Sequence, residues 1–148
     1  IFRYGEERLS RRIAARIADE REGSPIVTTK DLADLIWKSV PPSYRHGRIH
    51  PATRTFQALR IAVNGELDRL ERVIPLALGR LAPAGRLGII SFHSLEDRIV
   101  KHRFREIAAE GPYRLVTKKP IVPGEQETYE NPAARSAKLR VIEREEAA

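Results

Sequence analysis

Apolar residues recur at helical spacing through the first half of the chain. Leu9, Ile13 and Ile17 lie four residues apart between charged neighbours, which predicts an amphipathic helix over residues 6–22. After Pro51, a longer stripe at the same spacing predicts a long helix that includes Phe56, Leu59, Val63, Leu67, Leu70 and Ile74. Pro75 then predicts a kink or break, with a short turn of helix continuing to Leu81.

Between these two segments the pattern predicts a shorter helix and a loop. Thr28 and Asp31 have the spacing of a capping box, and the apolar residues Leu32, Leu35 and Ile36 follow them. Pro41-Pro42 ends this helix. Residues 43–50 are polar and basic without periodicity, so we expect an exposed loop there.

The second half of the chain changes to a strand pattern. Leu87–Phe92 is a nearly continuous apolar run, which is typical of a parallel strand covered on both faces. Ser94 and Asp97 predict the start of a following helix. Residues 113–117 and 137–143 are short strand candidates, and the connection between them reads as a long surface loop. This β-α-β unit has too few strands to close a doubly wound sheet by itself.

Basic residues are concentrated in two places along the chain. The 148 residues contain 27 Lys and Arg against 20 Asp and Glu, a net charge of +7. Residues 44–63 hold four arginines and no carboxylate, and a second concentration includes Arg98, Lys101, Arg103, Arg105, Arg114, Lys118 and Lys119. Such patches favour phosphate backbones, because each bound phosphate releases counterions. The alternative interpretation is a solvated basic face.

Several classes of protein are excluded or disfavoured by what the sequence lacks. No stretch approaches the roughly 20 apolar residues of a membrane span. There is no cysteine, hence no disulfide or thiolate metal site, which is compatible with the cytoplasmic location that we expect. The chain begins with Ile1 and contains no methionine, so we interpret it as a piece of a longer protein.

The candidate chemical motifs are individually weak. His46 and His50 have a zinc-ligand spacing but lie in a predicted loop, so we expect no metal site. Ser94 beside His93 is not part of a nucleophile elbow, and a helix-capping serine next to a strand-end histidine is the preferred interpretation. No glycine-rich phosphate loop is present.

The position of His93, Asp97 and Arg98 is more informative than their spacing. They follow a buried strand, and open α/β sheets bind ligands at the carboxyl ends of their strands. Asp97 has an alternative role, because an acidic residue in a first helical turn stabilises the helix dipole.

Five sequence strings together carry a family resemblance. The chain resembles the RsmH (MraW) family in HPATRTFQALRIAVN (50–64), LAPAGRL (81–87), SFHSLEDR (91–98), TKKP (117–120) and NPAARSAKLR (131–140). Members of this family are S-adenosylmethionine-dependent methyltransferases that modify a cytosine N4 in small-subunit (16S) ribosomal RNA. The resemblance covers only the carboxyl half of the family. Gly65 stands where the family usually has aspartate, and Ala84 replaces a customary glycine.

The resemblance implies an α/β fold. The chain would be the closing part of a class I, Rossmann-like methyltransferase sheet, preceded by part of an inserted all-helical domain. Residues 1–48 would belong to the inserted domain and residues 49–148 to the carboxyl-terminal part of the methyltransferase domain. The S-adenosylmethionine site would lie upstream of Ile1, so that no residue of this chain binds the cofactor and the segment alone is inactive.

The resemblance also implies site residues and a partner. His93 and Asp97 would shape the pocket for the target base. The residues expected to contact the RNA are Arg54, Gln57, Arg60, Arg98, Lys101, Lys118, Lys119, Arg135, Lys138 and Arg140. The expected partner is small-subunit ribosomal RNA or the small ribosomal subunit, with no membrane partner; a homodimer is left open. The alternative is a non-catalytic RNA-binding module or an inactive fragment.

Overall fold

The computed structural model describes residues 1–146, which form two compact units. The first unit comprises Ile1–Glu66 and the second begins at Leu67. No helix within residues 1–146 is long and apolar enough to cross a membrane.

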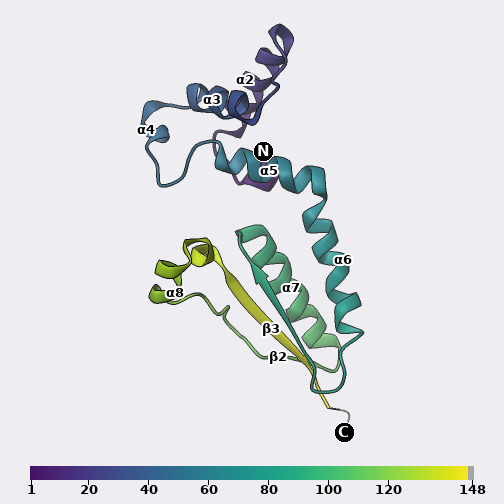
Figure 1. Cartoon of the computed structure of the whole chain (residues 1–148). Coiled ribbons are helices and arrows are strands. Elements are labelled where there is room, and N and C mark those ends of the chain that lie inside the picture. The colour runs from purple at the N-terminus through teal and green to yellow at the C-terminus, as the bar shows by residue number, and fades with distance from the viewer. Residues whose placement is uncertain (147–148) are drawn as a thin grey trace. The chain divides into compact units, whose positions relative to one another are not determined.

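The first unit is built entirely from helices (Figure 1). They are α1 (Phe2–Gly5), α2 (Ser10–Gly23), α3 (Thr29–Ser39), α4 (Pro42–Arg45) and α5 (Thr53–Asn64). The core of this unit consists of buried Ile13, Ile36, Val40 and Ala52. This core brings together α2, α3 and the residues just before α5. The apolar residues of α2 and α3 recur at helical spacing, so each helix has one apolar face to bury.

The capping box before α3 is confirmed. The Thr28 hydroxyl accepts from the backbone N–H of Asp31 at 3.1 Å, and the Asp31 carboxylate accepts from the N–H of Thr28 at 2.9 Å. These reciprocal bonds lower the pKa of Asp31 below its ordinary value. They satisfy two backbone donors that the first helical turn would otherwise leave without a partner.

The single long helix predicted after Pro51 is wrong. The chain forms α5 and then α6 (Glu66–Leu78), with Gly65 between them at φ 59°. The buried positions of α5 are Thr55, Ala58 and Ile61, whereas Val63 of the predicted stripe is 84% exposed. A left-handed residue ends a helix efficiently, and glycine adopts that conformation without strain.

Two further expectations about helices are corrected in part. Pro75 lies inside α6, which continues to Leu78, so a break at the proline is wrong, whereas a kink there stays a prediction. The segment 43–50 contains the helical turn α4, and the Tyr44 side chain is half-buried rather than exposed.

The second unit combines three strands with helices. Its elements are α6, β1 (Arg86–Ser91), α7 (Ser94–Glu110), β2 (Tyr113–Leu115), α8 (Glu125–Glu130), the 3-10 helix η1 (Pro132–Ser136) and β3 (Lys138–Arg144). The two predicted strands at 113–117 and 137–143 are confirmed as β2 and β3. The predicted surface loop between them is wrong in part, because it contains α8 and η1.

The last strand lies in the middle of the sheet. The strand order is β1-β3-β2, and both pairs are antiparallel. Ser91 at the end of β1 is opposite Lys138 at the start of β3, and Arg86 is opposite Glu143. The expectation of a parallel pair for β1 is therefore wrong within the described residues.

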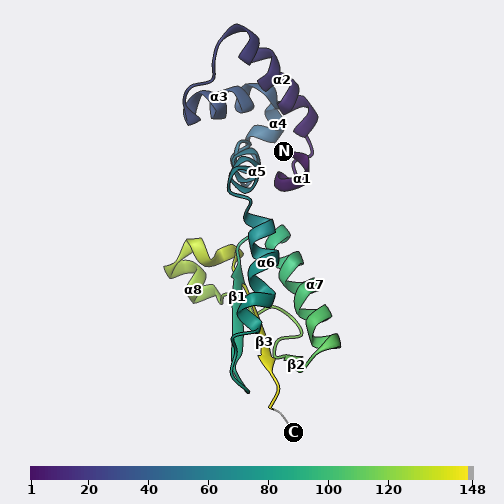
Figure 2. The same ribbon diagram turned by 90° about the vertical axis from the view of Figure 1, so that its right-hand side faces the viewer.

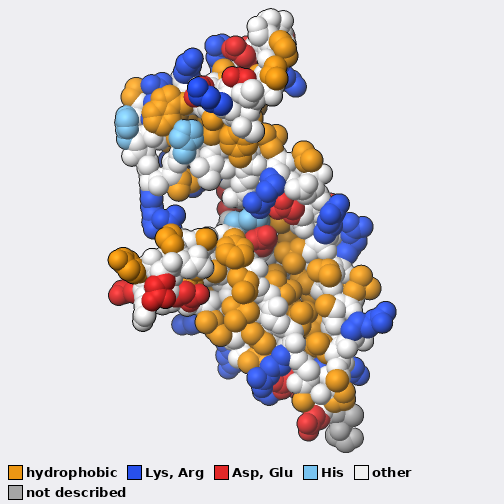
Figure 3. Space-filling view, in the orientation of Figure 1, with side chains coloured by type: hydrophobic (Ala, Val, Ile, Leu, Met, Phe, Trp, Pro, Cys, Tyr) orange, Lys and Arg blue, Asp and Glu red, His pale blue; other side chains and the backbone are white. Residues whose placement is uncertain are grey.

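The helices α6 and α7 cover one face of this sheet (Figure 2). Ile74 and Leu78 of α6, Val100 and Phe104 of α7, and Ile142 of β3 form its buried core. On the other face, Ile90 is 56% exposed and is not covered as the parallel-strand pattern predicted. Hydrophobic side chains gather at the surface of this unit in Figure 3.

Ala84, in the turn before β1, has φ 59°. The left-handed conformation explains why a glycine is customary there in the family that the sequence resembles. The described residues thus form a mixed α/β structure with a small antiparallel sheet. The Rossmann-like class and the domain boundary at residue 48 stay predictions.

Candidate functional site

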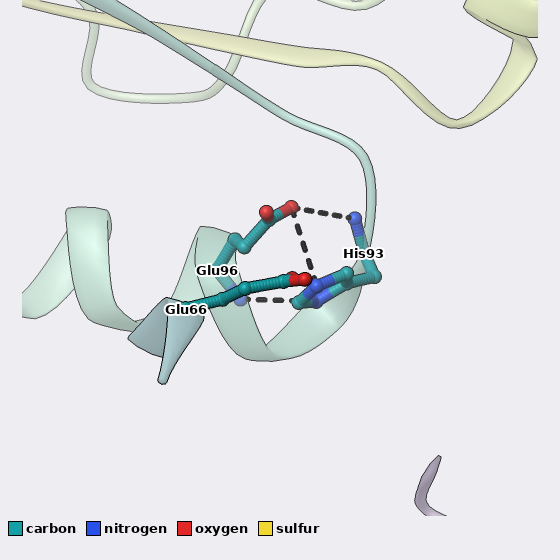
Figure 4. Close-up of side chains that lie close together, drawn as sticks. All are labelled: Glu66, His93 and Glu96. Carbon is teal, nitrogen blue, oxygen red and sulfur yellow. Dashed lines mark hydrogen bonds and ion pairs between the residues drawn. The ribbon is translucent and has the colours of Figure 1, made fainter. Parts of the chain in front are cut away.

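The candidate site begins where β1 leaves the sheet and α7 starts. His93, rather than the predicted Ser94, is the N-cap of α7. Its Nδ1 accepts from the backbone N–H of Glu96 at 3.3 Å, while Glu96 Oε2 accepts from the N–H groups of Phe92 at 2.9 Å and His93 at 3.3 Å (Figure 4). This reciprocal arrangement is a capping box with histidine in the place of serine. It fixes the backbone that follows the strand.

Asp97 lies one residue beyond this cap and forms an ion pair with the sheet. Arg140 donates to its carboxylate from Nε at 2.7 Å and from Nη2 at 3.3 Å, and Lys138 Nζ is 3.4 Å away. The side chains of Asp97 and Arg140 are 13% and 9% exposed. A forked guanidinium contact of this kind sets the orientation of both groups and joins the first turn of α7 to β3.

The basic partners control the charge of Asp97. Burial by itself would raise the pKa of this carboxyl, but the hydrogen bond and charge of Arg140, together with Lys138, outweigh burial and lower the pKa below its ordinary value. Asp97 is therefore a carboxylate at neutral pH and has no proton to donate. The geometry suits a positioning role for Asp97 better than a role as a general acid.

The basic residues near the start of β3 lie around the same end of the sheet. Lys138 is opposite Ser91, the last residue of β1, and Arg135 belongs to η1 immediately before β3. The backbone of Ile121 pairs with that of Leu139, which places the segment containing exposed Lys118 and Lys119 along β3. The structure thus places two of the residues predicted to bind RNA, Arg135 and Lys138, near the end of β1, whereas Lys118 and Lys119 lie beside Leu139–Val141 on the edge of β3 away from β1.

Arg140 differs from this group because it is buried. Its guanidinium faces Asp97, so it is not a surface contact in the structure. Lys101 is half-buried on α7, four residues after Asp97, and therefore on the same side of that helix. Arg98 points elsewhere on α7 and lines a shallow hollow with Glu71 and His102.

The predicted RNA contacts of the first unit make contacts within that unit. Arg54 Nη1 donates to the carbonyl of Glu6 at 3.1 Å, and Gln57 Nε2 donates to the carbonyl of Tyr4 at 3.0 Å. Both bonds tie α5 to the segment around α1. Arg60 forms an ion pair with Glu66, with Nε and Oε1 2.8 Å apart. Their role in RNA binding stays a prediction.

His46 and His50 lie against an aromatic side chain. The His50 ring stacks on Trp37, with centroids 5.3 Å apart, and the His46 ring meets Trp37 edge-on at 6.0 Å. His50 Nδ1 also accepts from the backbone N–H of Ala52 at 3.2 Å. This arrangement gives both imidazoles a structural role in the loop.

Sequence reasoning missed the residues that hold the site in place. Glu96 had a local signal, because it follows His93 by the capping-box spacing of three residues. Arg140 and Lys138 had been assigned to RNA, and no local pattern indicates that they bind a carboxylate 43 and 41 residues earlier. Only the pairing of β1 with β3 brings them together.

Comparison with known proteins supports the family resemblance carried by the sequence motifs. The model of the MraW methylase family matches residues 1–145. The chain belongs to this family. Membership confirms the resemblance in the sequence and places the chain among methyltransferases.

Individual relatives carry a more specific name. The chain is 62% identical over 143 residues to a ribosomal RNA small subunit methyltransferase H from Synechocystis sp., covering 97% of this chain and 45% of that protein. It is 58% identical over 143 residues to the protein of that name from Nostoc punctiforme, covering 97% and 46%, and 53% identical over 157 residues to that from Treponema denticola, covering 96% and 50%. The chain spans about half the length of the curated relatives it matches.

Proposed function

We propose that the full-length protein containing this chain transfers a methyl group from S-adenosylmethionine to the N4 of a cytosine in small-subunit ribosomal RNA. The observation that carries this proposal is the family match over residues 1–145. The names of the relatives, at 53–62% identity, support the class of RNA. The partner would be the RNA itself or the small ribosomal subunit in the cytoplasm.

The second unit would be the closing part of a Rossmann-like sheet. Within the described residues β1 pairs on one edge only, with β3, and the outer face of its apolar run is exposed at Ile90. An unpaired strand edge beside exposed apolar side chains is a surface on which another strand can add. Residues 1–48 would belong to the inserted helical domain, and residues 49–148 to the methyltransferase domain.

The residues at the end of β1 do not fit a cofactor site. The carboxylate of Asp97 is held by Arg140 and Lys138, and that of Glu96 accepts from backbone N–H groups. Neither has the free geometry needed to bind a ribose. We therefore assign the contacts to S-adenosylmethionine to residues outside this chain.

The role proposed for this chain is to bind and position RNA. An exocyclic cytosine amine is a weak nucleophile inside a stacked strand, so the target base must leave the stack and be held in line for transfer. Arg135 and Lys138 would hold phosphates near the end of β1, Lys118 and Lys119 would hold them beside β3, and Arg54, Gln57, Arg60, Arg98 and Lys101 would extend the contact. Arg140 would act through Asp97.

His93 and Asp97 would shape the base pocket by fixing its backbone. The capping box at His93 and the ion pair at Asp97 hold the turn between β1 and α7 from two sides. Both are positioning residues in this proposal, since His93 Nδ1 caps α7 and the Asp97 carboxylate is held by Arg140 and Lys138. Asp97→Ala should therefore lower turnover together with stability, and unchanged turnover would contradict the positioning role.

The proposed activity is tested on the full-length protein. Purified enzyme, radiolabelled S-adenosylmethionine and unmethylated small ribosomal subunits should give labelled RNA, and nucleoside mass spectrometry should identify N4-methylcytidine. RNA binding without label transfer would favour the alternative, a non-catalytic RNA-binding module. Absence of both binding and transfer would indicate an inactive protein.

The RNA surface is tested by reversing charge at Lys118 and Lys119. The double variant Lys118→Glu/Lys119→Glu should weaken RNA binding and reduce the dependence of affinity on salt concentration. The reason is that binding through fewer phosphate contacts releases fewer counterions. Arg80→Glu is the matched control, since Arg80 is also exposed but precedes β1. Equal effects of the two changes would show that the segment beside β3 is not part of the RNA surface.

A further inference from the structure

The helical unit contains a pocket that the family assignment does not explain. Its volume is about 540 Å³, and it lies among the residues between α1 and α2, the turn α4, the loop after α4 and the start of α5. The side chains that matter for its chemistry are Glu7, Arg8, Tyr44, Arg48, His50 and Arg54. A pocket of this size accommodates a small organic ligand.

The charge available to a ligand in this pocket is positive. Glu7 is fully buried, and both oxygens of its carboxylate accept from the Tyr44 hydroxyl at 2.8 Å, while Oε1 also accepts from the backbone N–H of Leu9 at 2.8 Å. Burial first, and the Glu7 carboxylate second, raise the pKa of Tyr44, so its phenol keeps the proton that it donates. Glu7 lines the pocket, but its oxygens already accept hydrogen bonds from the protein.

Three arginines line the pocket, against one exposed carboxylate. The Arg8 guanidinium lies 5.8 Å from the centre of the Tyr44 ring, and Arg54 is held at the pocket by its bond to the carbonyl of Glu6. Arg48 is exposed. The opposing charges are exposed Glu6 and buried Glu7, so three positive charges face two negative ones. Three guanidinium groups around one concave surface suit a phosphate, whose oxygens accept paired bonds from arginine.

The loop that carries Arg48 is held on both sides by aromatic contacts. His46 and His50 both contact Trp37, and His50 also accepts from the backbone of Ala52. Arg48 lies midway between the two anchored histidines, so the loop presents it at the pocket before any ligand arrives. Figure 3 shows His, Lys and Arg side chains gathered on this side of the helical unit, near α4. Preorganisation of this kind reduces the entropy lost on binding.

We propose that this pocket binds one nucleotide of a single-stranded RNA segment, with its phosphate between Arg8 and Arg48 and its base against the aromatic side of the pocket formed by Tyr44 and His50. Bases stack on aromatic rings without a strict sequence requirement. The proposal rests on the proposed function, since it takes RNA as the substrate. It adds Arg8 and Arg48, and a defined pocket, to the contacts that the proposed function already assigns to α5 of the helical unit.

The test measures binding of a short fluorescein-labelled single-stranded RNA to the full-length protein by fluorescence anisotropy over a range of salt concentrations. Arg8→Gln and Arg48→Gln should each raise the Kd by about tenfold, as expected for loss of a charge-assisted hydrogen bond. Each should also reduce the slope of log affinity against log salt by about 0.7. Arg12→Gln is the matched control, an exposed arginine of α2 outside the pocket.

A second variant separates position from charge. Trp37→Leu keeps every arginine but removes the ring on which both histidines rest. It should weaken RNA binding and leave the salt slope unchanged, with thermal unfolding used to show that the protein is folded. An unchanged Kd in Arg8→Gln and Arg48→Gln overturns the proposal, as does binding of poly-glutamate with the same dependence on both arginines. Failure of the wild-type protein to bind RNA would contradict the proposed function itself.

Discussion

Asp97 and Glu143 are both carboxylates held by two basic side chains, but the partners of Asp97 belong to β3, whereas those of Glu143 belong to β1 and β2. Asp97 pairs with Arg140, whose side chain is 9% exposed, and with Lys138. Glu143 accepts from Arg114 Nε at 2.9 Å and also pairs with Arg86, and those arginine side chains are 57% and 63% exposed. The two clusters have the same charges and differ in the burial of their cations.

This difference determines what each cluster does for the protein. If Asp97 is removed, Arg140 is left as a buried charge without compensation, which is strongly destabilising. If Glu143 is removed, Arg86 and Arg114 can turn to water, so no cation is left buried without a partner. The Asp97 pair therefore joins α7 to the sheet through a buried cation, whereas Glu143, itself buried, binds two arginines that stay in contact with water.

The largest expected effect is that of Asp97→Ala. The unfolding free energy should fall by about 3 kcal/mol, because the guanidinium of Arg140 loses its partner in a buried position. Urea denaturation followed by circular dichroism measures the change. Glu106→Ala on the same helix is the control, since Glu106 pairs with Arg103 at the surface; an equal loss in both variants would remove the distinction between buried and exposed pairs.

A double variant sharpens this result. Replacing both members of the pair, Asp97→Leu with Arg140→Leu, should recover most of the stability lost in Asp97→Ala, because no buried charge remains. A double variant as unstable as the single one would place the origin of the effect elsewhere in the turn between β1 and α7.

Acid should weaken both clusters. The pKa of Asp97 in the folded protein is lower than its ordinary value of 3.8. The ionised Asp97 carboxylate therefore stabilises the fold fully above pH 3.8. This stabilisation is lost as the pH falls through the lower pKa of the folded state. Below about pH 4 the unfolding free energy of the wild type should decrease more steeply than that of Asp97→Asn. Denaturation curves at successive pH values test this, and parallel slopes would contradict it.

Glu143→Gln should have the smallest effect. Hydrogen bonds from Arg86 and then Arg114 lower the pKa of Glu143, so the substitution removes a charge, but the arginines stay hydrated. The loss of stability should be smaller than for Asp97→Ala and should disappear in high salt, since exposed charges are screened. A loss that persists in molar salt would show that this cluster behaves like the buried pair.

Local signals predicted local structure well. The capping box of Thr28 and Asp31 and the buried Ile13 and Ile36 were predicted from spacing alone, because the hydrogen bonds and periodicity of a helix involve near neighbours. The same reasoning failed at Gly65, where the apolar stripe continued through a residue that adopts a left-handed conformation and ends α5. An apolar pattern does not report the backbone conformation that interrupts it.

The candidate site was predicted less completely. His93 and Asp97 were placed at the end of a strand correctly, since that position follows from the order of strand and helix. Their partners were not predicted, because the contact between Asp97 and Arg140 depends on which strands pair and on their register. Asp97 had two interpretations, a pocket residue and a helix-stabilising acid, and neither of them predicted its ion pair with Arg140.

The position of β3 also affects how the second unit folds during synthesis. β1 and β2 do not pair with each other; each pairs with β3, which follows both in the sequence. Until residues 138–144 have left the ribosome, neither earlier strand has its partner in β3, so the nascent chain carries edges that β3 covers only later. Such contacts of long sequence separation form slowly. Truncation before Lys138 should therefore remove both strand pairs of the described residues, β1-β3 and β2-β3, at once.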